Sequence, residues 1–123
     1  MIKEAYCSYE ISKFLKEKGF NWDCITYYVD SKPNDVKYSM LFENNTTWEE
    51  RCCSASTHQM AMAWLRKKSI IIVIQPEYFN TESKCSTWGV DIWADDNYEK
   101  LQGDYPKYEK AVEVALKYCL GLI

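Results

Sequence analysis

Residues 70–74 have the sequence Ile-Ile-Ile-Val-Ile, an apolar run with no polar position in it. β-Branched residues favour strands, and a strand that is apolar throughout is typical of one covered on both faces. A membrane-spanning helix needs about 20 apolar residues, so this run is far too short to cross a bilayer. We therefore predict a central, buried strand and no interaction with a membrane.

Patterns of helix and strand alternate along the other residues of this 123-residue chain. Apolar residues recur at helical spacing in three segments, which are 8–18, 56–68 and 106–119. Strand patterns occupy four segments, which are 24–29, 36–43, 70–74 and 87–94. The segments expected as loops are 44–55, 77–86 and 95–104. Ser8 and Ser56 are expected to cap the first two helices, and Gly19 to end the first.

The order α-β-β-α-β-β-α predicts an α+β fold made of a single domain, residues 1–123. The simplest arrangement is a four-stranded antiparallel sheet with the helices mainly on one face. Helices on one face would leave the other side of the apolar strand open. Either a helix crosses over to cover that side, or a second copy of the chain does, and we expect the second copy, in a homodimer, because twofold dimers are the commonest assembly.

The balance of charges limits the possible ligands. The net charge is −3 at neutral pH, whereas a protein that coats a nucleic-acid polymer needs a basic face to contact the phosphates. We therefore expect no nucleic-acid polymer as a partner. A single small anion remains possible, because it needs only one or two well-placed cationic groups.

The cysteines and the single histidine, His58, bear on compartment and metal binding. The first residues form no secretory signal, so we expect a cytoplasmic protein whose six cysteines are thiols. No C-x-x-C pair is present, so neither a metal nor a cofactor is expected. Cys52 and Cys53, followed by His58, come nearest to a ligand cluster, and their role stays open.

Catalysis would depend on His58, because a nucleophile needs a base within reach and this is the only imidazole. Near the start of a helix, His58 either serves as a neutral proton acceptor or faces solvent. The four glycines are isolated and form no phosphate-binding loop. We therefore predict a binding protein rather than an enzyme.

The helical segments resemble a family of short uncharacterised proteins encoded by phages and prophages of gut bacteria. The resemblance lies in residues 15–20, 57–61 with 64–66, and 108–113 with 115–120. It spans nearly the whole chain and consists of helix caps and core positions. It implies a small accessory protein in the cytoplasm of an infected bacterium. Such proteins often inhibit host components, and some sequester nucleotide-derived signals of antiviral defence.

Aromatic residues make up 15% of the chain, a surplus that fits a core, a self-interface or a ligand pocket. Flat rings stack on bases, and an arginine fork binds phosphate. The start of the second predicted helix offers backbone N–H groups to an anion. The candidate ligand-binding residues are Trp48, Arg51, Thr57, His58, Arg66, Tyr78 and Trp93.

These candidates predict a non-catalytic accessory protein that sequesters a small anionic, nucleotide-derived host molecule of defence signalling. The alternative is an inhibitor that binds a host protein through an aromatic-rich surface, since tyrosine, tryptophan and arginine dominate interface hot spots. The sequence alone does not separate the two.

Overall fold

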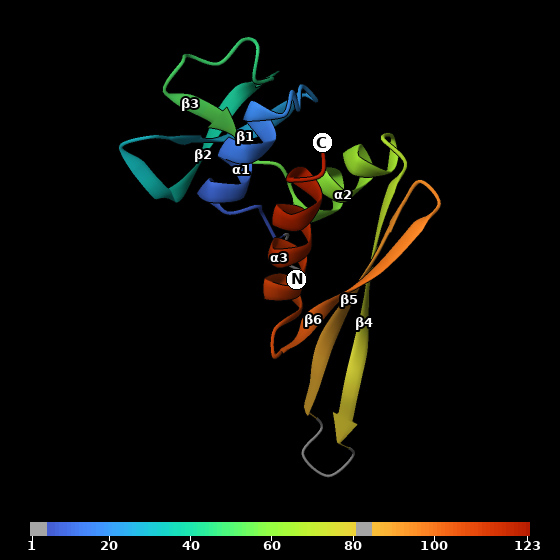
Figure 1. Ribbon diagram of the computed structural model, residues 1–123. Helices are drawn as coiled ribbons and strands as arrows, with labels where there is room; N and C mark the ends of the chain where they lie inside the picture. The colour runs from blue at the N-terminus through green and yellow to red at the C-terminus, as the bar shows by residue number, and fades with distance from the viewer. Residues whose placement is uncertain (1–4, 81–84) are drawn as a thin grey trace. The chain divides into compact units, whose positions relative to one another are not determined.

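The computed structural model describes the backbone of residues 5–80 and 85–123, and their side chains except those of residues 78–80, 85 and 86 (Figure 1). The chain folds into two compact units, Met1–Ala61 together with Ile123, and Met62–Leu122. The boundary falls within helix α2, His58–Arg66. Helices and antiparallel strands are combined along the chain, so the predicted α+β class is confirmed.

The first unit contains helix α1, Tyr9–Glu17, and a sheet of three antiparallel strands. The strands are β1 (Cys24–Val29), β2 (Lys32–Glu43) and β3 (Cys52–Ser54). Their order in the sheet is β2-β1-β3 (Figure 1). Alternate side chains of β1 are buried, and that of Tyr28 packs with Cys53 and Ala55 in a small core.

Both ends of α1 agree with the sequence prediction. The Ser8 hydroxyl accepts a hydrogen bond from the N–H of Ile11 at 3.2 Å, as an N-cap does. Gly19 has φ +93°, a conformation that costs glycine little. Phe20 then folds back, and its N–H donates to the carbonyl of Leu15. The Phe20 side chain is fully buried, which fixes where the chain leaves the helix.

Strand β2 is longer than predicted and irregular against β1. Val29 pairs with Lys32, so a tight turn joins the two strands and β2 begins before Pro33. Between the pairs Cys24↔Glu43 and Thr26↔Tyr38 the register shifts, because β2 bulges there. The bulge lies on an edge strand, which tolerates both a proline and extra residues.

The second unit contains the sheet β4-β5-β6 and helix α3, Tyr108–Leu120. The strands are β4 (Ile70–Asn80), β5 (Cys85–Ala94) and β6 (Asn97–Tyr105). Figure 1 shows β4 and β5 as a long hairpin with β6 beside β5. On α3, Val112 and Leu116 are fully buried, as is Val90 of β5, so the core of this unit lies between the helix and the sheet.

The apolar run 70–74 lies in an edge strand, so the prediction of a central strand covered on both faces is wrong. Ile70 is 4% exposed, whereas Ile71 is 47% and Val73 38% exposed. β-Branched residues favour an extended backbone whether or not both faces are buried. The central strand of this sheet is β5, whose Val90 and Ile92 are buried.

The prediction of one four-stranded sheet is also wrong, because two of the strands are formed by segments that were predicted as loops. β3 lies within the expected loop 44–55, and β6 begins within the acidic segment 95–104 and extends to Tyr105. Ala94 pairs with Asn97, so Asp95 and Asp96 form a two-residue hairpin turn, and Asp95 has φ 54° as such turns require. Within the expected loop 77–86, β4 continues to Asn80 and residues 81–84 lie outside the described residues.

Five of the six cysteines have a described side chain, and all five are thiols, as predicted. They are Cys7, Cys24, Cys52, Cys53 and Cys119. None of the helices formed by the described residues has the length and apolar composition needed to cross a bilayer.

Candidate functional site

The connection between β2 and β3, residues 44–51, crosses β1, because the two strands lie on opposite sides of it. It crosses on the face of β1 that carries Tyr27 and Val29, since both residues line a cavity together with residues of the connection. The other face of β1 carries the buried residues Cys24, Thr26 and Tyr28. The topology of the sheet therefore places the connection over the outward face.

Two asparagines hold the connection in place. Asn45 donates from Nδ2 to the carbonyl of Phe20 and accepts at Oδ1 from the N–H of Ser54, each at 2.8 Å. The carbonyl of Asn44 accepts from the N–H groups of Thr47 and Trp48 at 2.9 and 3.0 Å. These bonds give a defined shape to a polar segment that the sequence predicted as an irregular loop.

Trp48 is the residue of the connection whose side chain packs on the sheet. Its ring stacks on that of Tyr27, with centroids 4.6 Å apart and planes inclined by 30°. Its Nε1 donates a 2.7 Å hydrogen bond to Oγ of Ser54, a residue that is 1% exposed. The indole is therefore held by a neighbour on β1 and another on β3, and it stays half-buried.

A cavity of about 360 Å³ opens beside this ring and is called here the Trp48 cavity. Its volume lies at the lower end of the range of about 300–1,000 Å³ for small-molecule sites. Its lining residues are Tyr27, Val29, Glu43, Thr47, Trp48, Glu49, Arg51 and Cys52. The cavity combines two aromatic rings, one guanidinium and two carboxylates.

The charges around the Trp48 cavity are mixed. Arg51 is exposed and its guanidinium is the only cation among the lining residues, while Glu43 and Glu49 supply the two carboxylates. Arg51 is held through its backbone, where its carbonyl accepts from the N–H of Asp30 at 2.9 Å. The lining of the Trp48 cavity therefore sets one positive charge beside two negative ones.

The thiols at the base of the connection are poor nucleophiles. Burial raises the pKa of Cys52, and burial raises that of Cys53 to about 11. A thiol reacts through its thiolate, so neither group is activated at neutral pH. Cys52 lines the Trp48 cavity and Cys53 packs in the core of the first unit.

The start of α2 has fewer donors for an anion than the sequence suggested. The hydroxyl of Thr57 accepts from the N–H of Met60 at 3.1 Å, so Thr57, and not the predicted Ser56, caps the helix. The N–H of His58 donates to the carbonyl of Ala5 at 2.9 Å. Thr57 lines a second cavity, of about 200 Å³, and lies outside the lining of the Trp48 cavity.

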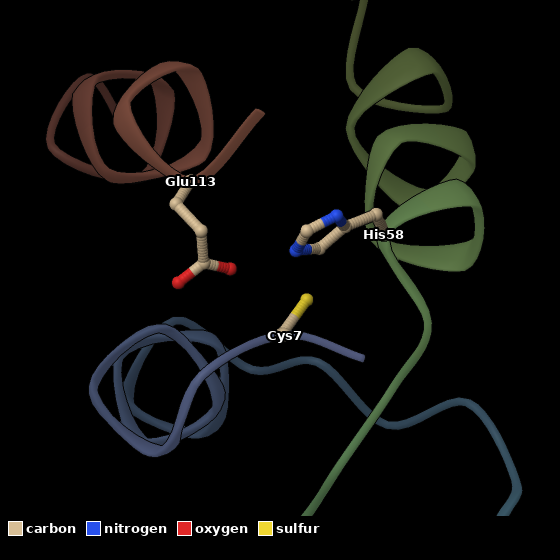
Figure 2. A group of neighbouring side chains, drawn as sticks. All are labelled: Cys7, His58 and Glu113. Atoms are coloured by element: carbon tan, nitrogen blue, oxygen red, sulfur yellow. The ribbon is translucent and has the colours of Figure 1, made fainter. Parts of the chain in front are cut away.

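His58 is buried, at 5% exposed, and does not face solvent. Figure 2 shows its ring directed toward the thiol of Cys7, which precedes α1 in the same unit. The ligand atoms of Cys7 and His58 lie within 4.8 Å of each other. The sequence grouped His58 with Cys52 and Cys53 instead. Cys7 is fully buried, and its Sγ also lies 3.5 Å from Oγ of Ser56.

The remaining candidates belong to the second unit. Arg66 is exposed at the end of α2. Trp93 on β5 is 46% exposed and packs against Tyr98, with ring centroids 4.6 Å apart. Tyr78 pairs with Thr87 through the backbone, and its side chain lies outside the described residues. Of the seven candidates, the Trp48 cavity brings together Trp48 and Arg51.

Sequence reasoning missed four residues at these places. Tyr27, Glu43 and Glu49 line the Trp48 cavity, and Cys7 lies beside His58. The alternation along β1 puts Tyr27 on the face opposite Tyr28, which was the available signal. Nothing in the spacing of Cys7 and His58 indicates their proximity, which comes from the backbone bridge between Tyr6 and Thr57.

Comparison of the chain with family models, curated proteins and solved structures finds no match.

Proposed function

We propose that the chain binds and sequesters a small ligand in the Trp48 cavity, and that this ligand has a flat heterocyclic ring and one anionic group. A nucleoside monophosphate or a cyclic nucleotide has this chemistry. The observation that carries the proposal is the placement of a stacked aromatic pair, Tyr27 and Trp48, next to Arg51 in one cavity.

The aromatic pair supplies the part of the site that would hold the ring. Stacking of a base on an aromatic side chain contributes about 1–3 kcal/mol and tolerates any base. The hydrogen bond from Trp48 to Ser54 holds the indole in position before a ligand arrives. A preorganised ring loses less conformational entropy on binding than a mobile one.

The charged groups narrow the ligand further. Arg51 can bind a phosphate with two parallel hydrogen bonds. Glu43 and Glu49 can only accept hydrogen bonds when ionised, so they fit the amino or imino groups of a base. The same carboxylates would repel a di- or triphosphate, which favours a ligand with a single anionic group.

Binding without conversion fits the chemistry of the lining. Among the described residues that line the Trp48 cavity there is no imidazole, since His58 is buried beside Cys7. The pKa of Cys52, the thiol in the lining, is raised by burial. The resemblance to phage accessory proteins extends the proposal: a chain that removes a nucleotide-derived defence signal need only bind it.

The test is calorimetric titration of the purified chain with nucleoside monophosphates, cyclic nucleotides and nucleoside triphosphates. We expect binding of at least one monoanionic or cyclic ligand and weaker binding of triphosphates. Arg51→Ala should weaken binding by about tenfold or more, the loss expected for a charge-assisted hydrogen bond. Glu49→Gln removes one of the two carboxylates that would repel a triphosphate. The difference in affinity between monophosphates and triphosphates should therefore become smaller.

Arg66→Ala is the matched control, because Arg66 is an equally exposed arginine of the other unit. It should leave affinity unchanged. Equal effects of Arg51→Ala and Arg66→Ala, or no heat from any ligand of the panel, would overturn the proposal.

A role as an inhibitor of a host protein is the second candidate, and the open face of the second sheet favours it. Ile71, Trp93 and Tyr98 lie in one row across β4, β5 and β6, and each is about half exposed. Aromatic side chains of this kind dominate interface hot spots. This candidate predicts that Trp93→Ala abolishes binding to one defined host protein while nucleotide binding is unaffected.

A further inference from the structure

The bulged part of β2 exposes an unusual group of large apolar side chains. Met40 is 99% exposed, Leu41 73%, Phe42 71% and Tyr38 66%. They are consecutive or nearly so on an edge strand, and in the described part of the chain no strand pairs with the outer edge of β2. An exposed apolar edge strand is a template for pairing with another strand.

We propose that this edge binds a second copy of the chain, with segment 37–43 of β2 pairing antiparallel to the same segment of the other copy. The segment has the sequence Lys-Tyr-Ser-Met-Leu-Phe-Glu. A twofold axis through Met40 places Met40 opposite Met40 of the second copy. The same register places Tyr38 opposite Phe42, and Lys37 opposite Glu43.

The segment is self-complementary in this register. Opposite charges meet at both ends, and aromatic residues meet on either side of the centre, the cross-strand pairs that stabilise antiparallel sheets. A twofold interface uses the same patch on both copies, so only a sequence that matches its own reversal fits. A register moved by one residue along the strand loses the charge pairing at both ends.

The size of the contact fits a weak or moderate dimer. Four large side chains from each copy lose solvent contact, and aromatic residues bury about 150–250 Å² each. The total is on the order of 1,000 Å², the lower limit for a specific interface. The second cavity adds to it, because Phe42 lines it with Ile25 and Met60, next to the position that Tyr38 of the second copy takes.

Two surrounding features favour a second copy over an unrelated strand. Lys37 and Glu43 are half-buried and stand at the two ends of the segment, where the pairing of opposite charges sets the register. Pro33 lies outside the pairing segment, near the start of β2, where it ends the ladder. A strand of another protein would satisfy the backbone groups, but it would have to carry the same reversed pattern of charge and aromatic residues.

Analytical ultracentrifugation over a range of protein concentrations gives the first test. The wild-type chain should pass from monomer to dimer as concentration rises. Met40→Lys should shift the midpoint at least tenfold upward, because it places two like charges face to face at the axis. Because Met40 is 99% exposed, this variant should keep the wild-type unfolding curve, so loss of the dimer is not loss of the fold.

Charge reversal tests the register itself. Lys37→Glu and Glu43→Lys should each be monomeric, since each places like charges opposite one another twice. Mixed in equal amounts, the two variants should form a heterodimer, because both end pairs then join opposite charges. A wild-type chain that stays monomeric up to a concentration on the order of 1 mM, or single variants that dimerise as well as the wild type, would overturn the proposal. So would stoichiometric capture of one host protein by a chain that remains monomeric.

Discussion

The indole of Trp48 lies on the ring of Tyr27, with centroids 4.6 Å apart. Tyr27 belongs to the middle strand of its sheet, and Trp48 belongs to a connection that joins the two outer strands. The contact is therefore a result of topology: a chain that runs from one edge of a three-stranded sheet to the other has to cover the strand between. The crossing turns the outward face of the sheet into the wall of a cavity.

Trp48→Phe tests how firmly this ring is held. Phenylalanine keeps a ring that can stack on Tyr27 but has no N–H, so Oγ of Ser54 loses its donor at a site 1% exposed. We expect the free energy of unfolding to fall by about 1–2 kcal/mol, measured by urea unfolding. Trp93→Phe, at a side chain 46% exposed, is the control and should change it by less than about 0.5 kcal/mol. Equal losses in the two variants would contradict the role given to Ser54.

Gly19→Ala tests the end of α1. Gly19 has φ +93°, and a Cβ added there would meet no atom within 4 Å, so any loss comes from backbone strain alone. We expect a loss of about 1–2 kcal/mol in the free energy of unfolding, again by urea unfolding.

Gly121→Ala is the control for the positive φ, because Gly121 ends α3 with φ −69°, a helical conformation that alanine adopts, and an added Cβ would lie 3.3 Å from the carbonyl oxygen of Tyr118. It should change the unfolding free energy by less than about 0.5 kcal/mol. A loss at position 121 as large as that at position 19 would show that strain is not the cause.

The helices could be predicted from the sequence because their signals are local. Ser8 and Gly19 mark the two ends of α1, and both act as expected. The spacing of Ala111, Val112 and Cys119 identifies the buried face of α3, and all three are fully buried. A cap or a helical stripe depends on residues a few positions apart, so its physics is contained in the sequence.

The sheets were less predictable because strand pairing is a long-range property. Cys52 and Cys53 form β3 only because β1 is available as a partner. The run at 70–74 indicates a strand but not which neighbours cover it, and the pairing of β6 with β5 is what makes β4 an edge strand.

For the site, Trp48 and Arg51 were chosen as candidates because aromatic and arginine residues on a connection are a functional signal. Tyr27 and Glu43 join them only through the fold.

Asp91→Asn tests a polar network on the outward face of the second sheet. Asp91 is 6% exposed, and its carboxylate accepts hydrogen bonds from Tyr98 at 2.7 Å and from Gln75. An amide keeps one oxygen to accept from Gln75, but it turns an N–H₂ toward the Tyr98 hydroxyl, which must then accept instead of donate, and neither bond has a charged acceptor any longer. We expect the free energy of unfolding to fall by about 1–3 kcal/mol, whereas Asp35→Asn, on an exposed part of β2, should have no effect.

The same variant has a spectroscopic readout. The hydrogen bond to Asp91 raises the pKa of Tyr98 above its ordinary value. Without the carboxylate, an absorbance titration at alkaline pH should show one tyrosine ionising at lower pH than in the wild type. An unchanged titration would mean that Asp91 does not hold the Tyr98 hydroxyl in solution.

Cys119 predicts how stability depends on alkaline pH. Its side chain is fully buried in α3, and burial raises its pKa from 9.0 to about 12. Above pH 9 the unfolded chain loses this proton while the folded chain keeps it, so unfolding releases a proton and is favoured by rising pH. The stabilisation is complete below pH 9 and is lost as pH rises toward 12, by up to about 1.4 kcal/mol per pH unit. Cys119→Ala should therefore make the fall in unfolding free energy between pH 9 and 10.5 less steep, measured by urea unfolding at several pH values.

Two other groups with raised pKa values are present in both proteins, so their contributions cancel in the comparison. They are Cys53, whose pKa is raised to about 11, and Tyr9, whose pKa is raised to about 12 by its hydrogen bond with Asp30. Parallel pH profiles for the two proteins would show that the thiol of Cys119 ionises as readily in the folded chain as in the unfolded one.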